Sequence, residues 1–423
     1  MKPELAAPAA SVQFGADSAW RRAEAALATV AAGATGFRVF PLAGVSPGLV
    51  IGLMLLPVWW PHTARFRGAR TLMALFGAAA VAGWILAWAA PATYQILSTR
   101  LRFDSGLVLG LAVGLGVLVW ARNVIPPGQL AVTFGIGAIV ASGFGGGLWS
   151  ENPWKYALDA PVAIAVLGAV RGRRWLTCCA LAVLAAVSLV CVSRASFMIF
   201  VVTLGLVFAA GAPARWRRSL SWPRLALIVA VASMMLVWAG TWAMSSGLLG
   251  AGVQQRTKMQ IDEAGSLLSG GRQEFYATFA LLGYRPAGFG LGVSVDEPTI
   301  EVARAGMATN VPPDPHYLRD YMFGSGVELH SVAADLWARC GWVGVALAAA
   351  ILIVVIRGLA RSFREGDLDP LAACLAVWTL WNLAFAPLYS AGVTLALGLA
   401  LILPRVREHR VAAALQRSLP YER

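Results

Sequence analysis

The residue best suited to catalysis in this 423-residue chain is His330, one of only four histidines. It stands between Glu328 and Ser331, where a long hydrophilic stretch gives way to an apolar run over 331–356. A helix over that run would extend about 39 Å at about 1.5 Å per residue, which exceeds the roughly 30 Å thickness of the hydrocarbon core. Its first turns are therefore expected to protrude or to line a wet cavity, with His330 at the rim.

An imidazole at such a rim is suited to general-base catalysis, because its ordinary pKa of about 6.5 lies near neutral pH. The alternative is an interfacial histidine with no chemical role. His316 is the competing histidine, but prolines at 312, 313 and 315 indicate a mobile, irregular loop around it. Asp335 and Arg339 are spaced as an i,i+4 pair, which predicts a helix that begins near His330.

Two arginines are the other polar residues of interest near the same membrane face. Arg194 lies within 192–196, where one apolar run ends and the next begins. A charge at that depth is costly and is usually paired or functional, although a side chain that reaches the headgroups or caps a turn is the alternative. Arg272 begins a predicted short helix, where the helix dipole disfavours a cation, so helix stability does not explain it. A solvated loop arginine is the alternative there.

Other patterns that often carry chemistry are weak here. The glycines at 288, 290 and 292 do not form a nucleotide-binding fingerprint, because no strand precedes them and no helix of a βαβ unit follows. The glycine cluster from Gly143 to Gly147 favours helix packing or a turn. Histidines and carboxylates do not cluster at metal-ligand spacing, and the five cysteines show no C-x-x-C spacing. The sequence therefore predicts no metal site, no disulfide framework and no cofactor.

The elements that must position these residues are those of an all-α, polytopic membrane protein. Hydrophobic residues make up 58% of the chain, the mean hydropathy is +0.68 and charged residues make up 13%, against roughly 25% in soluble domains. Uncharged runs of about 20 residues recur, as a bilayer requires of a helix. This composition excludes soluble nucleotide enzymes, nucleic-acid-binding modules and disordered chains. About twelve spans are predicted, at 25–44, 45–60, 70–91, 104–121, 127–147, 157–170, 175–193, 195–211, 225–243, 331–356, 370–387 and 390–404.

Three of these spans, 45–60, 157–170 and 390–404, are short for a transmembrane helix. Each is short enough to be re-entrant or to begin within the membrane interface.

The distribution of charge sets the predicted topology. With the N-terminal tail 1–24 in the cytoplasm, 22 lysines and arginines lie in inside segments and four lie in the short outside segments. Because this bias follows the positive-inside rule, the net charge of +13 reflects topology rather than nucleic-acid binding. Nine spans over 25–243 are expected to precede a large outside loop at 244–330. Three spans over 331–404 then lead to a basic cytoplasmic tail at 405–423.

The N-terminus lacks the basic region and short apolar stretch of a cleaved signal, so the first span is expected to be retained. The outside loop has 87 residues, of which six are basic and nine acidic. A loop of this length is usually functional or disordered. Phe275, Phe279 and Leu282 have helical spacing within 272–284, which predicts a short amphipathic helix followed by a tight turn at the glycines. The stretch 311–315 is expected to be irregular.

In combination, these motifs resemble the O-antigen ligase and polymerase superfamily of bacterial envelopes. The resemblance extends over roughly residues 185 to 360 in motifs and over the whole chain in topology. The motifs in chain order are Ser193-Arg194-Ala195, Arg272-x-x-x-Tyr276, Pro286-x-Gly288-x-Gly290-x-Gly292, His330-Ser331 and Gly341-x-x-Gly344.

The resemblance implies a GT-C-like membrane glycosyltransferase that takes a glycan from an undecaprenyl diphosphate donor on the periplasmic face, without a nucleotide sugar or a metal. Carried over by position, Arg194 and Arg272 would hold the donor diphosphate, and His330 would activate or position the acceptor hydroxyl. Guanidinium groups suit that role, because they contact phosphate oxygens in a bidentate manner and stabilise a departing diphosphate. Many relatives have asparagine after the histidine, whereas this chain has Ser331.

The sequence therefore predicts a glycan transferase of the bacterial inner membrane that is most like an O-antigen ligase, with lipid A-core as acceptor. An O-antigen or exopolysaccharide polymerase, which extends a lipid-linked glycan chain, shares the chemistry and stays open. Transfer to protein hydroxyls is less favoured, because no large C-terminal extension follows the last span. A transporter or lipid flippase is the alternative from another class. The scarcity of carboxylates in the spans and the large outside loop favour an enzyme.

Overall fold

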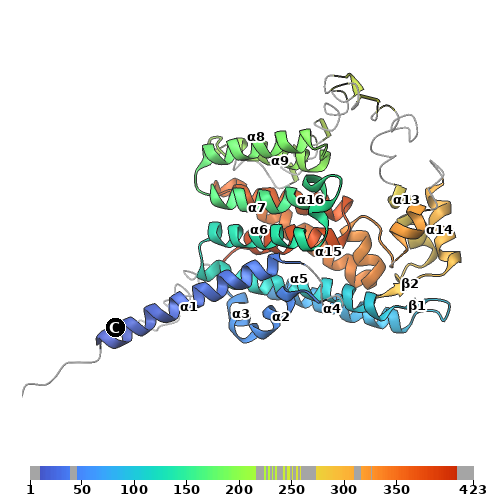
Figure 1. Cartoon of the computed structure of the whole chain (residues 1–423), viewed down its shortest axis with the longest axis horizontal. Coiled ribbons are helices and arrows are strands. Elements are labelled where there is room, and N and C mark those ends of the chain that lie inside the picture. Colours follow the sequence, from blue (N-terminus) through green and yellow to red (C-terminus); the bar gives the residue numbers. More distant parts are fainter. Residues whose placement is uncertain are drawn as a thin grey trace, which may run out of the picture.

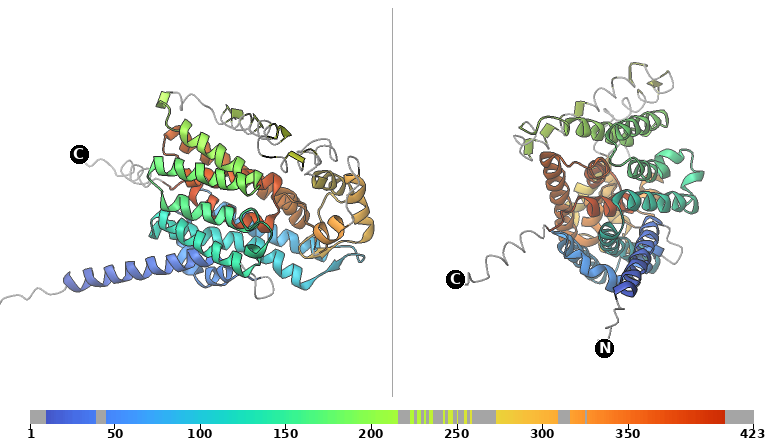
Figure 2. Two further views of the ribbon diagram at one scale, coloured as in Figure 1. Left: turned by 45° about the horizontal axis from the view of Figure 1, so that its top comes forward. Right: turned by 90° about the vertical axis from the view of Figure 1, so that its left-hand side faces the viewer.

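The computed structural model is mostly helical and describes residues 10–38, 45–215, 273–308, 316–324 and 326–406, with isolated residues between 223 and 258. The long helices run side by side in one bundle, and a smaller group of elements between residues 273 and 324 lies at one end of it (Figure 1). Figure 2 shows the same arrangement from two further sides. The predicted helical class is therefore confirmed.

The first half of the chain contributes most of the bundle. Its elements are α1 (Ala10–Gly36), α2 (Pro47–Met54), α3 (Leu56–Thr63), α4 (Ala69–Trp88), β1 (Gln95–Ile96), α5 (Ser98–Val124), α6 (Pro127–Phe144), the 3-10 turn η1 (Gly147–Trp149), the π turn η2 (Trp154–Leu158), α7 (Asp159–Ala169), α8 (Arg174–Val190) and α9 (Arg194–Ala209).

The second half contributes the group at the end of the bundle and three more long helices. Its elements are α13 (Gln273–Tyr284), β2 (Val293–Ser294), α14 (Glu297–Met307), the π turn η3 (Tyr317–Met322), α15 (Val332–Glu365), α16 (Pro370–Phe385) and α17 (Leu388–Ile402).

Four of the described helices, α4, α5, α6 and α15, are long and apolar enough to cross a membrane. The helices α8, α9, α16 and α17 are apolar but shorter. The predicted count of about twelve spans stays a prediction, and most of the span predicted at 225–243 lies outside the described residues.

The predicted span 45–60 is not one helix, because α2 and α3 each have eight residues and meet at Leu55. Pro57 lacks the amide hydrogen that would continue the α2 hydrogen-bond pattern, so the chain must start a new helix there. The indole Nε1 of Trp59 donates to the carbonyl of Gly52 across the break, at 2.7 Å. Two short helices thus replace one expected span.

The central helix is α5, which packs against α1, α2, α3, α4 and α17. Its side chains from Leu107 to Trp120 are largely buried. Glycines on the same helix let neighbours approach closely: a Cβ at Gly116 would lie 2.5 Å from the Trp59 ring, and one at Gly114 would lie 3.1 Å from Thr35 Cγ2. The neighbours of α5 are therefore held at short interhelical distances.

The predicted loop helix is confirmed as α13, and the glycine turn that follows it is wedged between two helices of the bundle. The amides of Phe289 and Gly290 donate to the carbonyl of Ala338 on α15, at 2.7 and 3.1 Å, and the amide of Leu291 donates to Gly83 on α4, at 3.1 Å. After this turn, β2 pairs antiparallel with β1. The loop region is thereby fixed to α4, α5 and α15.

Helix α15 begins within this loop region and has a kink at Gly341, where φ is 60° and ψ is −148°. A Cβ at Gly341 would lie 2.6 Å from the Ala287 carbonyl oxygen, so the kink allows the glycine turn to pack against the helix. The nine residues before the kink, 332–340, carry several buried polar side chains that position the candidate site.

Candidate active site at the start of α15

His330 lies directly before the N-cap of α15, and its backbone has the left-handed φ of 52° that non-glycine residues rarely adopt. The segment is fixed on both sides. The amide of Leu329 donates to Asp335 Oδ1 at 2.7 Å, and Ser331 Oγ donates to the Leu383 carbonyl at 2.8 Å and accepts from the Ala334 amide. An unfavourable backbone conformation maintained in this way is typical of functional sites.

The His330 ring has a different neighbour at each nitrogen. Its Nε2 lies 2.6 Å from the hydroxyl of Tyr321, whose ring centroid is 4.8 Å away. Its Nδ1 is buried without a hydrogen bond and lies 3.9 Å from Glu274 Oε1. The same Glu274 oxygen accepts a hydrogen bond from Tyr317, while Glu274 Oε2 is buried without a partner. The site thus joins the start of α15 to α13 and η3.

This arrangement suits a histidine that acts as a base. Burial raises the pKa of Tyr321 well above its ordinary value, and the nearby Tyr389 hydroxyl raises it further. The Tyr321 hydroxyl therefore keeps its proton. A protonated Tyr321 can donate to Nε2, which puts the hydrogen of the neutral ring on Nδ1, facing Glu274. The carboxylate can then orient the ring and stabilise its cation after proton uptake. The His330 side chain is 16% exposed, so a substrate group can reach it.

A buried ion cluster lies beside this segment and is centred on Arg339, which is fully enclosed. Its guanidinium contacts Asp104 on α5 at 3.2 Å, Glu328 at 2.9 Å and Asp335 at 3.2 Å. Arg100 contacts both Asp104, at 3.0 Å, and Glu328. Burial alone would raise the pKa of Glu328, but Arg339 and Arg100 outweigh it, and the pKa lies below its ordinary value.

Arg194 is the first residue of α9 and is half-buried. The residues that flank it contact α7 and α8: Ser196 donates to Asp159, Ser193 donates to Ser196 at 3.0 Å, and the Ser193 amide donates to the Ser188 carbonyl at 2.8 Å. These neighbours differ from the loop elements that surround His330. Arg272 lies outside the described residues, immediately before α13.

His316, the competing histidine, has a side chain that is 90% exposed and lies 3.4 Å from Asp320 on the surface. The geometry therefore favours His330.

The sequence interpretation missed Glu274 and Tyr321. The sequence does carry a signal for Glu274, because it lies two residues after Arg272 within the Arg272-x-x-x-Tyr276 motif.

Within the described part of the chain, no group of three or more histidine, cysteine, aspartate or glutamate side chains is placed to hold a metal ion. The three clustered carboxylates of Asp104, Glu328 and Asp335 instead enclose the Arg339 guanidinium.

Comparison of the chain with protein-family models, with curated proteins and with solved structures finds no match.

Proposed function

We propose that this chain transfers a glycan from an undecaprenyl diphosphate donor to an acceptor hydroxyl, at the periplasmic face of a bacterial inner membrane. The observation that carries the proposal is the environment of His330, whose Nδ1 faces Glu274 at 3.9 Å while Nε2 bonds to Tyr321. The motif resemblance described above supports the choice of donor. A ligase that uses lipid A-core is the first candidate, and a polymerase differs from it only in the acceptor.

In the proposed reaction, the acceptor oxygen forms a bond to the anomeric carbon of the donor glycan. The bond from that carbon to the diphosphate oxygen breaks, and undecaprenyl diphosphate leaves with the electron pair. His330 takes the hydroxyl proton on Nε2, where the Tyr321 hydroxyl now lies, so the acceptor displaces Tyr321 or passes its proton through it. A well-placed general base contributes about 10²- to 10⁴-fold to the rate. Arg194 and Arg272 are assigned to the diphosphate.

The membrane arrangement belongs to the same proposal: a GT-C-like fold with about twelve spans and the 244–330 loop outside. It is supported by the charge bias between inside and outside segments. In spheroplasts of a cysteine-free background, a cysteine at exposed Glu301 should react with an impermeant reagent, whereas a cysteine at Arg215 should not. The reverse labelling pattern would contradict the periplasmic site.

The activity itself is tested with purified protein in liposomes that contain an undecaprenyl diphosphate-linked glycan and lipid A-core. His330→Ala should abolish glycan transfer. His330→Asn should do the same, and it tolerates the left-handed backbone better than alanine does, so misfolding would not explain its loss. The exposed His316→Ala is the matched control and should retain transfer. Native-like transfer by the folded His330 variants would refute the proposed role.

A further inference from the structure

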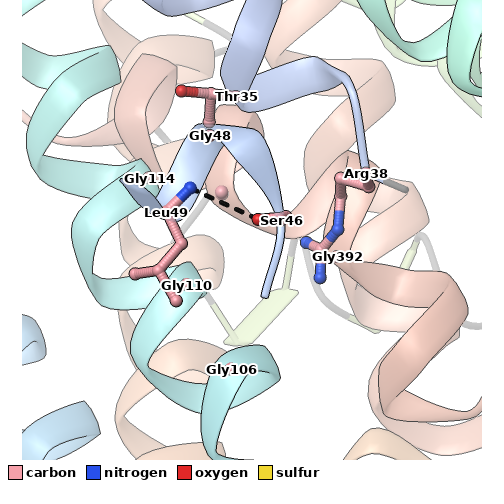
Figure 3. A pocket seen from close by; sticks show the side chains of 10 residues that line it. Thr35, Arg38, Ser46, Gly48, Leu49, Gly106, Gly110, Gly114 and Gly392 are labelled. Atoms are coloured by element: carbon pink, nitrogen blue, oxygen red, sulfur yellow. Dashed lines mark hydrogen bonds between the residues drawn. The ribbon is translucent and has the colours of Figure 1, made fainter. Parts of the chain in front are cut away.

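A narrow pocket lies where the end of α1, the start of α2, α5 and α17 meet (Figure 3). Five of its ten lining residues are glycine: Gly48 from α2, Gly106, Gly110 and Gly114 from α5, and Gly392 from α17. The one charged side chain in the lining is Arg38, which follows the end of α1 and extends beside Gly392. The sequence interpretation passed over Arg38, although it is the only charged residue within the predicted span 25–44.

Arg38 is a cation that has no counter-charge among the residues that the structure describes. Among the described residues, it makes no hydrogen bond and no ion pair, and its side chain is half-buried. The guanidinium packs so closely on α17 that a Cβ at Gly392 would lie 1.8 Å from Nη1. Withdrawing a guanidinium from water among apolar helices is unfavourable unless an anion accompanies it. Within the described part of the chain, the guanidinium thus stands in the pocket without an anionic partner, and an anionic ligand would supply one.

The other polar groups of the pocket also favour an anion. Ser46 is the N-cap of α2, and its Oγ accepts from the Leu49 amide at 3.3 Å, which leaves the hydroxyl hydrogen available to donate. Gly48, at the second position of α2, lines the pocket as well. Pro47 has no amide hydrogen, and the amides of Leu49 and Val50 donate to Ser46. The Gly48 amide is thus the first-turn donor left for a ligand, and it lies at the partially positive end of the helix. A guanidinium, a hydroxyl and a helix N-terminus thus meet in one pocket.

We infer that this pocket binds the phosphate group of a lipid headgroup. A guanidinium binds phosphate oxygens in a bidentate manner, and first-turn amides are suited to the same group. The pocket is formed by apolar helices, so an acyl or isoprenoid tail could lie along them while one phosphate oxygen enters the narrow opening. The inference does not depend on glycan transfer. The phosphate could come from an isoprenoid phosphate or from a glycerophospholipid.

The pocket shares two helices, α5 and α17, with residues around the candidate active site. On α17, Gly392 is one turn beyond Tyr389, the neighbour of Tyr321, and on α5, Gly106 is two residues beyond Asp104 of the ion cluster. One helical turn rises about 5.4 Å. A phosphate at Arg38 would therefore lie in the same region of the bundle as the His330 segment.

The test is lipid binding by the purified full-length chain in detergent, measured by native mass spectrometry. Four probes separate the sources: undecaprenyl phosphate, phosphatidylglycerol, inorganic phosphate, and undecaprenol as a lipid without phosphate. The native protein should bind at least one phosphate-bearing lipid more tightly than it binds undecaprenol. Of undecaprenyl phosphate and phosphatidylglycerol, the one that binds more tightly identifies the source of the phosphate group. Equal binding of undecaprenol, or binding of inorganic phosphate alone, would overturn the inference.

Variants of the pocket connect binding to Arg38. Arg38→Gln should weaken binding of the phosphate lipid about tenfold or more, the loss expected for a hydrogen bond to a charged group. Arg38→Lys keeps the charge but loses the planar guanidinium, so its affinity for the phosphate lipid should lie between those of the native protein and Arg38→Gln. Gly392→Ala keeps every polar group but displaces the guanidinium, and it should also weaken binding. The matched control is Gly205→Ala on α9, where an added Cβ meets no atom within 4 Å. Native affinity in folded Arg38→Gln and Gly392→Ala would refute the site.

Discussion

Arg339 and Glu328 form a buried ion pair, with 2.9 Å between Nη2 and Oε1, that joins α15 to the segment carrying His330. Through Asp335, the same guanidinium is connected both to that segment and to the start of α17, because Asp335 accepts the amides of Leu329 and Leu388 at 2.7 and 2.8 Å. The cluster thus links α5, α15 and α17 around the candidate base. We expect it to stabilise the start of α15, which His330 precedes.

The first prediction concerns Arg339→Met. The substitution would remove the cation that three buried carboxylates share, although Arg100 would still contact Asp104 and Glu328. Breaking a buried charge network typically lowers stability by about 3–5 kcal/mol. Thermal unfolding in detergent can be followed with a thiol-reactive dye that reports exposure of the buried Cys340 and Cys374. Arg361→Met is the matched control on the same helix, since its pair with Glu365 spans 4.0 Å and is partly exposed. Arg361→Met should lower the free energy of unfolding by less than about 1 kcal/mol. Equal midpoints for both variants would contradict the role of the cluster.

A second prediction follows from the lowered pKa of Glu328. Burial opposes ionisation, but the attraction of Arg339 and Arg100 outweighs it and holds the pKa below the ordinary 4.5. The unfolded chain therefore takes up the proton first as the pH falls. The stabilising contribution of Glu328 is complete above about pH 4.5 and is lost as the pH drops through the lowered value.

The thermal unfolding midpoint of the native protein should accordingly decrease as the pH is lowered from 6 to 3. Glu328→Gln should be less stable than the native protein at pH 6 and should lose less stability on acidification. Glu365→Gln, at the exposed pair, should follow the native curve. A Glu328→Gln curve parallel to the native one would contradict the assignment of the acid-labile stability to this carboxylate.

Much of the helical framework could be predicted from the sequence, because apolar runs and charge breaks are local properties. The loop helix α13 and the Asp335–Arg339 pair, at 3.2 Å, are confirmed for the same reason. The division of 45–60 into α2 and α3 was missed, although Pro57 and its effect on the backbone were visible in the sequence.

The candidate site was less predictable, because its partners are far apart in the chain. Arg339 meets Asp104, which lies 235 residues before it, and His330 lies beside Glu274. No local period signals such pairings, since they arise only when the loop packs between helices. Arg38 was missed for a different reason: a lone arginine in an apolar run has no sequence partner, and its environment is known only from the packing of α5 and α17.

A third prediction concerns the glycine turn, whose function is close packing. Gly290 has φ of 108°, and a Cβ there would lie 2.4 Å from the backbone nitrogen of Ala87. Gly290→Ala should therefore destabilise the protein by more than about 1 kcal/mol, through both backbone strain and overpacking. Gly283→Ala in the adjacent helix is the control, since an added Cβ meets no atom within 4 Å. A Gly290→Ala protein with a native unfolding midpoint would show that the turn is not packed in this way.

The last prediction tests how Glu274 acts on His330. Glu274→Gln keeps the size of the side chain but removes the charge that faces Nδ1. We expect kcat for glycan transfer to fall about 10-fold to 100-fold, less than the 10²- to 10⁴-fold that a base itself contributes.

A Tyr317 variant separates a direct effect of the Glu274 carboxylate on His330 from a merely structural role. If Glu274 only anchored Tyr317, removal of that anchor would lower kcat as much as Glu274→Gln does. Tyr317→Phe removes the anchor and keeps the carboxylate that faces Nδ1, so it should retain a kcat near the native value. Glu297→Gln, at an exposed partner of Arg319 in the same loop region, should leave kcat unchanged. Equal losses of kcat in Glu274→Gln and Tyr317→Phe would exclude a direct role of Glu274 at His330, while loss of transfer in His330→Asn would still support the base itself.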